Sequence, residues 1–153
     1  MKNKRGISAV VATVLIILIT VAAVTIIWAA IIPMINNQLN RGTVCLDAMT
    51  ALSIQNKGYT CFDNASNQVR VQVSYGSKDV GLVGIQVLVS DSLGNTNSTL
   101  EKNALNLPGN NGEKVITVPQ STTAEFVSIA PVVSVGGQEE TCDALASVKL
   151  TAC

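Results

Sequence analysis

The feature that most constrains this chain is an uninterrupted apolar run near its amino terminus. No residue from Ile7 to Ile35 is charged, and the next charged residue is Arg41. As an α-helix these 29 residues extend about 43 Å, beyond the roughly 30 Å hydrocarbon core of a bilayer. The run is rich in Val, Ile and Thr, which favour strands in water. In lipid, however, only a helix satisfies its own backbone groups, so the sequence predicts a membrane-spanning helix over residues 7–35.

Polar side chains interrupt the run only at Ser8, Thr13, Thr20 and Thr25. We expect each hydroxyl to bond back to the carbonyl four residues earlier, so none excludes the segment from lipid. Pro33 lacks a backbone N–H and is expected to kink or end the helix near the start of polar sequence.

The charges around the run predict its orientation. Basic residues precede it, at Lys2, Lys4 and Arg5, and none follows immediately. Positive charge favours the cytoplasmic side of a membrane. We therefore expect the amino terminus in the cytoplasm and the chain from about residue 40 outside the cell.

Three interpretations of this segment remain open on these observations. A cleaved secretory signal needs an apolar core of only about 7–15 residues, and this run continues well beyond that length. An uncleaved signal anchor fits both length and orientation. Neither gives a role to Gly6, which lies at the border between the basic residues and the apolar run.

The third interpretation gives the glycine a role. The sequence Lys4-Arg5-Gly6 followed by ISAVV resembles the class III signal peptide of type IV pilin-like proteins, in particular archaeal pilins and archaellins. The resemblance covers roughly residues 4–35. It implies that a prepilin peptidase cuts between Gly6 and Ile7, releases residues 1–6 as a leader and leaves the helix on the mature protein.

The same resemblance implies a filament. Mature subunits would leave the membrane with the help of an assembly ATPase and a platform protein, and their helices would pack with copies of the chain or related pilins. Small residues permit close approach of such helices, and this helix carries Ala9, Ala12, Ala22, Ala23, Ala29 and Ala30. Bacterial-type pilins usually carry a glutamate where this chain has Val11, a departure that favours the archaeal branch and leaves subunit register to apolar packing.

The rest of the chain predicts a polar linker over residues 36–44 and a β domain over residues 45–153. Apolar and polar residues alternate over 69–75 and 85–89, as in half-buried strands. Residues 115–118 and 126–135 also predict strands, with Pro131 placing the latter at an edge or a bulge. The expected fold class is α+β, a long apolar helix followed by an immunoglobulin-like sandwich of about seven short strands.

Four cysteines lie in the predicted exterior domain, Cys45, Cys61, Cys142 and Cys153. An even count outside the cell favours two disulfides over a zinc site, because the chain has neither Cys-x-x-Cys nor histidine. Three pairings are possible. Local pairs would join Cys45 to Cys61 and Cys142 to Cys153, whereas a cross pairing such as Cys45 to Cys153 would hold the two ends of the domain together.

Two glycosylation sequons occur, at Asn64-Ala65-Ser66 and Asn97-Ser98-Thr99, and we expect both in exposed turns. Asn-rich turns also produce such triplets by chance. Glycosylation would add solubility and protease resistance to a filament surface.

Composition argues against several kinds of chemistry. With no histidine, imidazole-based catalysis is excluded for this chain, and seven cations against ten anions after Gly6 give no basic surface for a nucleic acid. Asp63, Asp79 and Asp91 are expected in turns but lack calcium-loop spacing. We therefore expect no cofactor, no metal and no enzyme. The expected function is a pilin-like filament subunit that serves adhesion or cell contact, and the alternative is a membrane-anchored binding domain that never polymerises.

Overall fold

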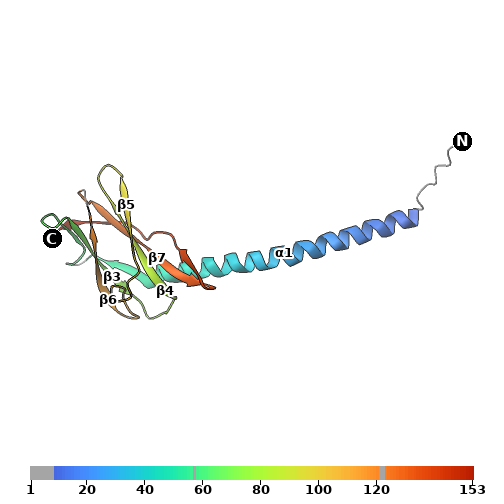
Figure 1. Cartoon of the computed structure of the whole chain (residues 1–153), viewed down its shortest axis with the longest axis horizontal. Helices are drawn as coiled ribbons and strands as arrows, with labels where there is room; N and C mark the ends of the chain where they lie inside the picture. The colour runs from blue at the N-terminus through green and yellow to red at the C-terminus, as the bar shows by residue number, and fades with distance from the viewer. Residues whose placement is uncertain (1–8, 57, 121–122) are drawn as a thin grey trace. The chain divides into compact units, whose positions relative to one another are not determined.

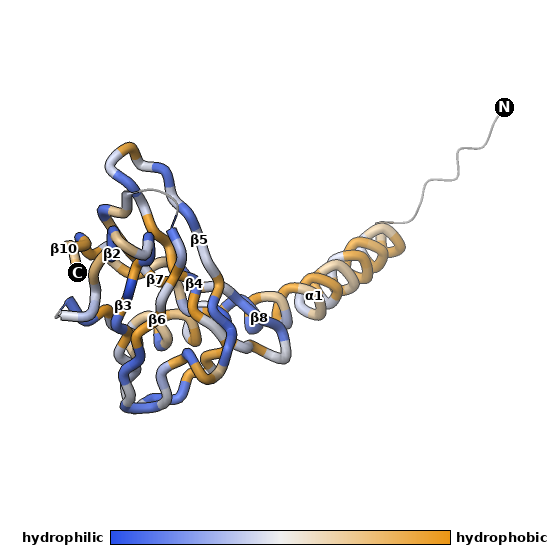
Figure 2. Tube along the Cα trace, turned by 60° about the vertical axis from the view of Figure 1, so that its left-hand side comes forward, coloured by the Kyte–Doolittle hydropathy of each residue, from blue (hydrophilic) through white to orange (hydrophobic). Residues whose placement is uncertain are grey.

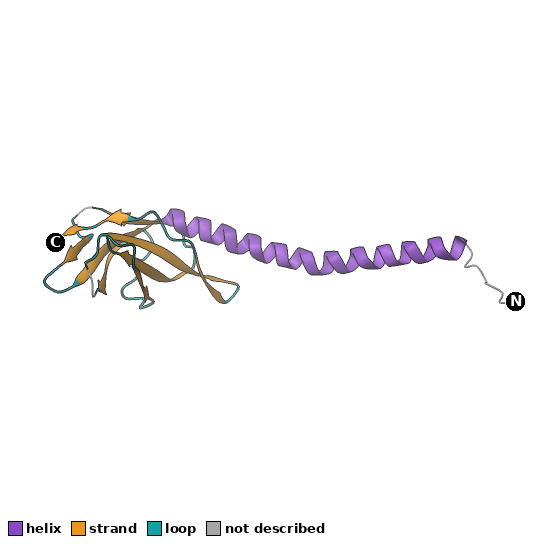
Figure 3. Ribbon diagram, turned by 90° about the horizontal axis from the view of Figure 1, so that it is seen from above, coloured by secondary structure: helices purple, strands orange, loops and turns teal. Residues whose placement is uncertain are grey.

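The computed structural model describes residues 9–56, 58–120 and 123–153 (Figure 1). The chain divides into two units, Met1–Leu39 and Asn40–Cys153. Helix α1 runs from Ala9 to Ala51 and contributes to both, while the strands all belong to the second unit. The predicted fold class is confirmed, with one long apolar helix followed by a β-sandwich (Figure 3).

Two antiparallel-rich sheets form the sandwich among the described residues. The first contains β1 (Leu52–Gln55), β2 (Cys61–Asp63), β3 (Gln68–Tyr75), β6 (Glu113–Pro119) and β10 (Thr151–Ala152). The second contains β4 (Leu82–Ser90), β5 (Thr96–Glu101), β7 (Phe126–Val135), β8 (Gln138–Thr141) and β9 (Val148–Lys149). Strand β3 lies between β6 on one side and β1 and β2 on the other, and β4 lies between β5 and β7.

The core lies between the inner faces of the two sheets. Because successive side chains of a strand point to opposite faces, the alternating residues predicted from sequence become the buried rows. In β3 these are Val69, Val71, Val73 and Tyr75, and in β4 they are Ile85, Val87 and Val89. The predicted strands at 69–75, 85–89, 115–118 and 126–135 are therefore confirmed.

Two glycines form the hairpin turn at the end of β7. Gly136 and Gly137 join β7 to β8, with Val135 paired to Gln138 across the turn. Their φ angles are 59° and 82°. A two-residue hairpin with both central residues at positive φ requires the missing Cβ of glycine.

The predicted linker over residues 36–44 is wrong, because this segment is helical and α1 does not end until Ala51. The helix continues because its last turns bury an apolar face against the sandwich. Val44 is half-buried, Ala48 is fully buried and Ala51 is half-buried. Their spacing of four and three residues places them on one side of a helix, and this contact outweighs the weak helix propensity of the polar residues before them.

Pro131 was expected at an edge or a bulge, and the edge assignment is wrong. It pairs in register with Ile85 and is one of the fully buried residues of β7, which has neighbours on both sides. Its carbonyl accepts the N–H of Cys142 at 2.9 Å, so its nitrogen also faces away from β4. On that side β8 ends at Thr141 and β9 begins at Val148, so the missing N–H lies in the gap between the two strands.

Candidate functional site

The first candidate site is the exposed apolar surface of α1 within the first unit. The described residues from Ala9 to Leu39 carry no charge, and all are exposed except Ala12, which is half-exposed. Mean hydropathy reaches 3.0 in this helix, and its amino-terminal turns are mostly apolar (Figure 2). It is the one described helix long and apolar enough to cross a membrane. Such a surface is stable only in lipid or against other apolar surfaces.

The alanines named from the sequence fall on two lines of this helix. At 3.6 residues per turn, separations of 7 and 11 residues return to nearly the same face. Ala12, Ala23 and Ala30 therefore share one face, with Ala9 at its border. Ala22 and Ala29 form a second line. Each line is a strip of small side chains along which another helix can approach closely.

The threonine hydroxyls are satisfied within the helix, although not as predicted. Thr13, Thr20 and Thr25 donate to carbonyls three residues earlier, not four, each at 2.9 Å. The apolar surface therefore presents no unpaired threonine hydroxyl to lipid or to a neighbouring helix. Ser8 lies outside the described residues.

The predicted leader and cleavage site also lie outside the described residues. This applies to Lys2, Lys4, Arg5, Gly6 and Ile7. The expectation that a peptidase cuts after Gly6 stays a prediction.

The last turns of α1 are held to the sandwich by three kinds of contact. Cys45 forms a disulfide with Cys142, with 5.4 Å between the Cα atoms. Arg41 pairs with Glu140 at 3.1 Å, and Lys78 pairs with Asp47 at 2.7 Å, both at exposed positions. Exposed ion pairs contribute little individually, so the covalent bond and the buried Ala48 face account for most of this attachment.

The second disulfide joins Cys61 in β2 to Cys153, with 5.2 Å between the Cα atoms. Next to it, Cys153 donates its N–H to the carbonyl of Phe62 at 3.0 Å. The predicted pair of disulfides is confirmed, but neither the local pairing nor the Cys45–Cys153 pairing occurs. The apolar helix indicates that the chain is targeted to a membrane. The disulfides indicate that its β domain is exposed to an oxidising compartment.

The two sequons differ in local structure. Asn64 lies in an exposed turn after β2, as expected. Asn97 was expected in a turn too, but it lies in β5, paired with Val89 of β4. Asn97 is nevertheless exposed.

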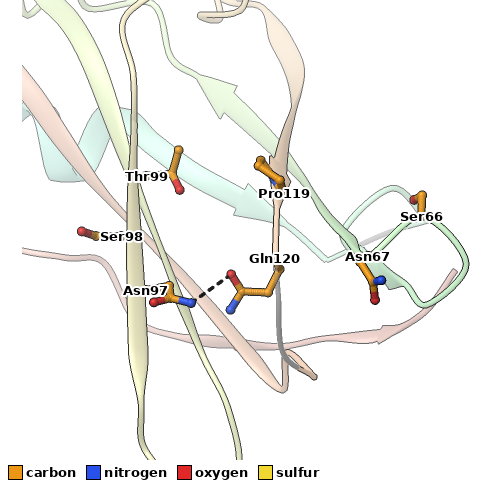
Figure 4. A pocket seen from close by; sticks show the side chains of 7 residues that line it. All are labelled: Ser66, Asn67, Asn97, Ser98, Thr99, Pro119 and Gln120. Atoms are coloured by element: carbon orange, nitrogen blue, oxygen red, sulfur yellow. Dashed lines mark hydrogen bonds between the residues drawn. The ribbon is translucent and has the colours of Figure 1, made fainter.

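Asn97 lines a hollow in the β domain, with a volume of about 570 Å³, between β5 and the end of β6 (Figure 4). The lining residues are Ser66, Asn67, Asn97, Ser98, Thr99, Pro119 and Gln120. They are uncharged, and all but the proline are polar. The Nδ2 of Asn97 donates to the Oε1 of Gln120 at 3.4 Å across this space. Sequence reasoning found Asn97 from its sequon but missed Gln120, which no motif marks.

The three aspartates considered for calcium do not converge. The carboxylate of Asp63 accepts bonds from Ala65 and Ser66, that of Asp79 from Gly81, and that of Asp91 from Leu93 and Asn95. Each therefore organises its own turn. Within the described residues no group of three His, Cys, Asp or Glu side chains is placed to hold a metal ion.

Two of these carboxyls have perturbed pKa values. The hydroxyl of Ser66, followed by the N–H groups of Ala65 and Ser66, holds the pKa of Asp63 below its usual value. The side-chain amide of Asn95 is the main cause of the lowered pKa of Asp91. Bonds donated to the charged form favour ionisation, so both turns are built around carboxylate anions.

Comparisons of the chain with protein-family models, with curated proteins and with solved structures find no match.

Proposed function

We propose that this chain is the structural subunit of an extracellular filament of the type IV pilus kind. It is made as a prepilin, cleaved after Gly6 and assembled through its amino-terminal helix, and its β domain forms the filament surface for adhesion or cell contact. The observation that carries the proposal is the described part of α1 up to Ile35, which is uncharged, apolar on all sides and marked by two lines of alanine.

Such a helix does not gain its free energy of assembly from the hydrophobic effect when it leaves lipid. Lipid tails are as apolar as Ile or Val, so the hydrophobic effect does not favour transfer from bilayer to filament core. The gain must come from close helix packing, which small side chains permit. Ala12, Ala23 and Ala30 on one face, with Ala22 and Ala29 on another, offer two such surfaces per subunit. A subunit with two packing faces can continue a helical array.

The attachment of the helix end supports the same proposal. In a filament, any load on the surface domain passes to the helix core through their junction. Here Cys45 in the last turns of α1 is covalently joined to Cys142 beyond β8. A junction fixed by a disulfide suits a subunit that bears load.

The partners of this proposal follow from the family resemblance of the sequence. They are a prepilin peptidase, an assembly ATPase, a membrane platform protein and further copies of the chain or related pilins. The location changes from the cell membrane before assembly to a filament on the cell surface afterwards.

An uncleaved membrane-anchored binding domain is the second candidate. A helix that is apolar on every side also fits a single span surrounded by lipid. Its last turns would attach the β domain to the anchor in the same way. The two candidates differ in whether the leader is removed and whether the helix meets other helices.

Leader cleavage separates them first. We expect the mature protein in its native host to begin at Ile7, since Gly6 borders the basic residues and the apolar run. Gly6→Phe should leave the precursor in the membrane, because a bulky side chain obstructs the peptidase at the cut. Terminal-peptide mass analysis of both proteins measures this.

Ser8→Ala serves as the matched control, since it also changes a residue near the cut but leaves the glycine in place. It should be processed like the wild type. If the wild-type chain retains residues 1–6 in a host that processes other prepilins, the anchored domain is the correct assignment.

A further inference from the structure

The hollow beside β5 has the chemistry of a site for a neutral, hydroxyl-rich ligand. Its lining supplies side-chain amides from Asn67, Asn97 and Gln120, the hydroxyl of Thr99, and no charge. Its volume of about 570 Å³ lies within the range of roughly 300–1,000 Å³ found for small-molecule sites. Gln120 is 7% exposed, an uncommonly buried amide for the rim of an open hollow.

The register of the second sheet directs Asn97 into this hollow. Asn97 is paired with Val89 and Thr99 with Val87, and both valines belong to the core. Directly opposed residues of antiparallel strands share a face. The side chains of Asn97 and Thr99 therefore lie on the core side of β5, where both residues are exposed, Asn97 beside Gln120 and Thr99 across from Pro119 (Figure 4).

Two unpaired strand edges border the same hollow. Among the described residues β5 pairs only with β4, and β6 only with β3. The carbonyl of Asn95 accepts the N–H of Asp91 at 3.1 Å, so the backbone groups of Asn95 point toward β4. Because these groups alternate along a strand, the N–H and C=O groups that point away from β4 belong to Thr96, Ser98 and Leu100. The free edge of β6 ends in Pro119, which weakens further pairing. The edge of β5 has no proline and no charge from Thr96 to Leu100.

We propose that a saccharide N-linked to Asn97 occupies this hollow and covers the free edge of β5. In the transfer, Nδ2 of Asn97 bonds to the anomeric carbon of a sugar carried by a lipid-linked phosphate. The sugar–phosphate C–O bond breaks, the phosphate leaves with the electron pair, and one amide proton passes to a base of the transferase. The remaining N–H of Nδ2 still donates to Gln120. The proposal rests on the exterior location in the proposed function.

The covalent link decides the source of the sugar. No aromatic side chain lines the hollow on which a sugar ring could stack, so a free saccharide binds weakly. A saccharide attached at Asn97 has an effective concentration in the millimolar range or above. The site is therefore filled by the chain's own glycan.

The other sequon is less suited to modification of the folded domain. The hydroxyl of Ser66 donates to Oδ2 of Asp63 at 2.8 Å, and the N–H of Ala65 donates to Oδ1 of the same residue at 2.9 Å. The triplet beginning at Asn64 is thus closed into a turn. The triplet beginning at Asn97 is extended and exposed, which leaves it accessible to a transferase.

Site occupancy is the first test. The full chain, purified in detergent from a host that glycosylates sequons, should carry glycan at Asn97 at higher occupancy than at Asn64 in glycopeptide mass analysis. Asn97→Gln and Thr99→Val should lose that glycan, whereas Thr99→Ser should keep it. A chain modified only at Asn64, or at neither site in a host that modifies other proteins, overturns the proposal. Neither result touches cleavage at Gly6, so the filament proposal is tested separately.

Seating of the sugar is the second test. Hydrogen exchange at residues 96–100 should be slower by roughly three- to tenfold in the glycosylated chain than in the unglycosylated one. Gln120→Ala should remove most of this protection without lowering occupancy. Gln86→Ala, on the opposite face of the same sheet, should leave it intact. If Asn97 carries glycan but hydrogen exchange at residues 96–100 is not slowed, the saccharide does not occupy the hollow and this part of the proposal is overturned.

Added sugar distinguishes the two sources of the ligand. The attached saccharide has an effective concentration in the millimolar range or above. Free N-acetylglucosamine at about 1 mM or below should therefore leave hydrogen exchange of the unglycosylated chain unchanged. Slowed exchange at residues 96–100 under those conditions would make the hollow a receptor for free saccharide and overturn the tethered assignment.

Discussion

At the scale of single residues, Asp91 shows how one side chain shapes the exterior domain. Its Oδ1 accepts the N–H groups of Leu93 and Asn95, each at 2.9 Å, and its Oδ2 accepts the Asn95 amide at 2.9 Å. These bonds close the turn between β4 and β5 and so set where β5 begins. They also hold the pKa of Asp91 below its usual value, chiefly through the Asn95 side chain.

This predicts an acid-dependent effect of Asp91→Asn. A carboxyl whose pKa is lowered in the folded state stabilises the fold above its unfolded pKa, here near 3.8, and loses that contribution as pH falls through the lower folded value. Asp91→Asn should therefore lower the Tm at pH 7, and the difference from wild type should shrink near pH 2. Thermal unfolding followed by circular dichroism measures this. Ser92→Ala, in the same turn, should show no such pH trend, and an Asp91→Asn deficit that persists unchanged at pH 2 would contradict the account.

At the scale of elements, α1 combines two segments with different surroundings. The described residues up to Leu39 are uncharged, and those up to Ile35 expose apolar side chains on all sides. The turns from Asn40 to Ala51 belong to the β domain and bury one face through Ala48. Gly42 lies in these turns with open space around the position a Cβ would take.

Gly42→Ala should therefore stabilise the chain. A helical glycine at ordinary φ costs about 0.5–1 kcal/mol relative to alanine through its backbone entropy. We expect the free energy of unfolding to rise by about that amount in urea titrations of the detergent-solubilised chain. Gly58→Ala is the matched control: its surroundings are equally open, but its φ of 78° disfavours an L side chain. It should destabilise. A loss of stability in Gly42→Ala would contradict the helical assignment of residues 36–51.

The elements also show where sequence reasoning succeeds. The charge-free run predicted the amino-terminal helix, because no other structure satisfies its backbone in lipid. Strands β3 and β4 were predicted because one face of each is more deeply buried than the other. Apolar and polar residues therefore alternate along their sequences.

What the sequence left open depends on contacts between distant residues. Residues 36–44 look like a linker until the sandwich covers Val44 and Ala48. Pro131 fits a central strand because β8 ends and β9 begins beside it, a feature of the assembled sheet. Gln120 belongs to the candidate site only because the fold brings the end of β6 close to β5. The number of disulfides was predicted, but their pairing depends on which cysteines the folded domain brings together.

At the scale of the whole molecule, the two disulfides enclose almost the entire exterior domain. They link residues 97 and 92 positions apart in the sequence. Crosslinks that close loops of this length restrict the unfolded chain strongly. The domain has few aromatic residues to enlarge its core, at 3% of the chain, so these bonds carry a large share of its stability.

Removing either disulfide should lower the free energy of unfolding by about 2–5 kcal/mol. The two disulfides close loops of nearly equal length, so their removal should cost a similar amount of entropy. The variants are the double substitutions Cys45→Ala/Cys142→Ala and Cys61→Ala/Cys153→Ala. Urea unfolding under non-reducing conditions measures both. The first variant alone should also loosen the end of α1, seen as faster hydrogen exchange in residues 43–51. If both variants are as stable as wild type, the disulfides do not contribute to the stability of the domain as claimed.

The central claim at this scale is that α1 packs against other copies of α1. An anchor helix tolerates any apolar side chain, because lipid conforms to it. A helix packed on several sides does not, and an added side chain there costs about 1–3 kcal/mol per site. Ala12→Leu and Ala22→Leu test the two alanine lines, and Val21→Leu is the control at a position that already carries a branched side chain.

The most direct measurement is the chain content of filaments sheared from the surface of the native cells, by electron microscopy and mass analysis. The account predicts wild-type filaments that contain this chain beginning at Ile7. It predicts normal cleavage but a sharp fall in filament yield for Ala12→Leu and Ala22→Leu, with Val21→Leu close to wild type. It is contradicted if the wild-type chain stays in the membrane fraction and no sheared filament contains it.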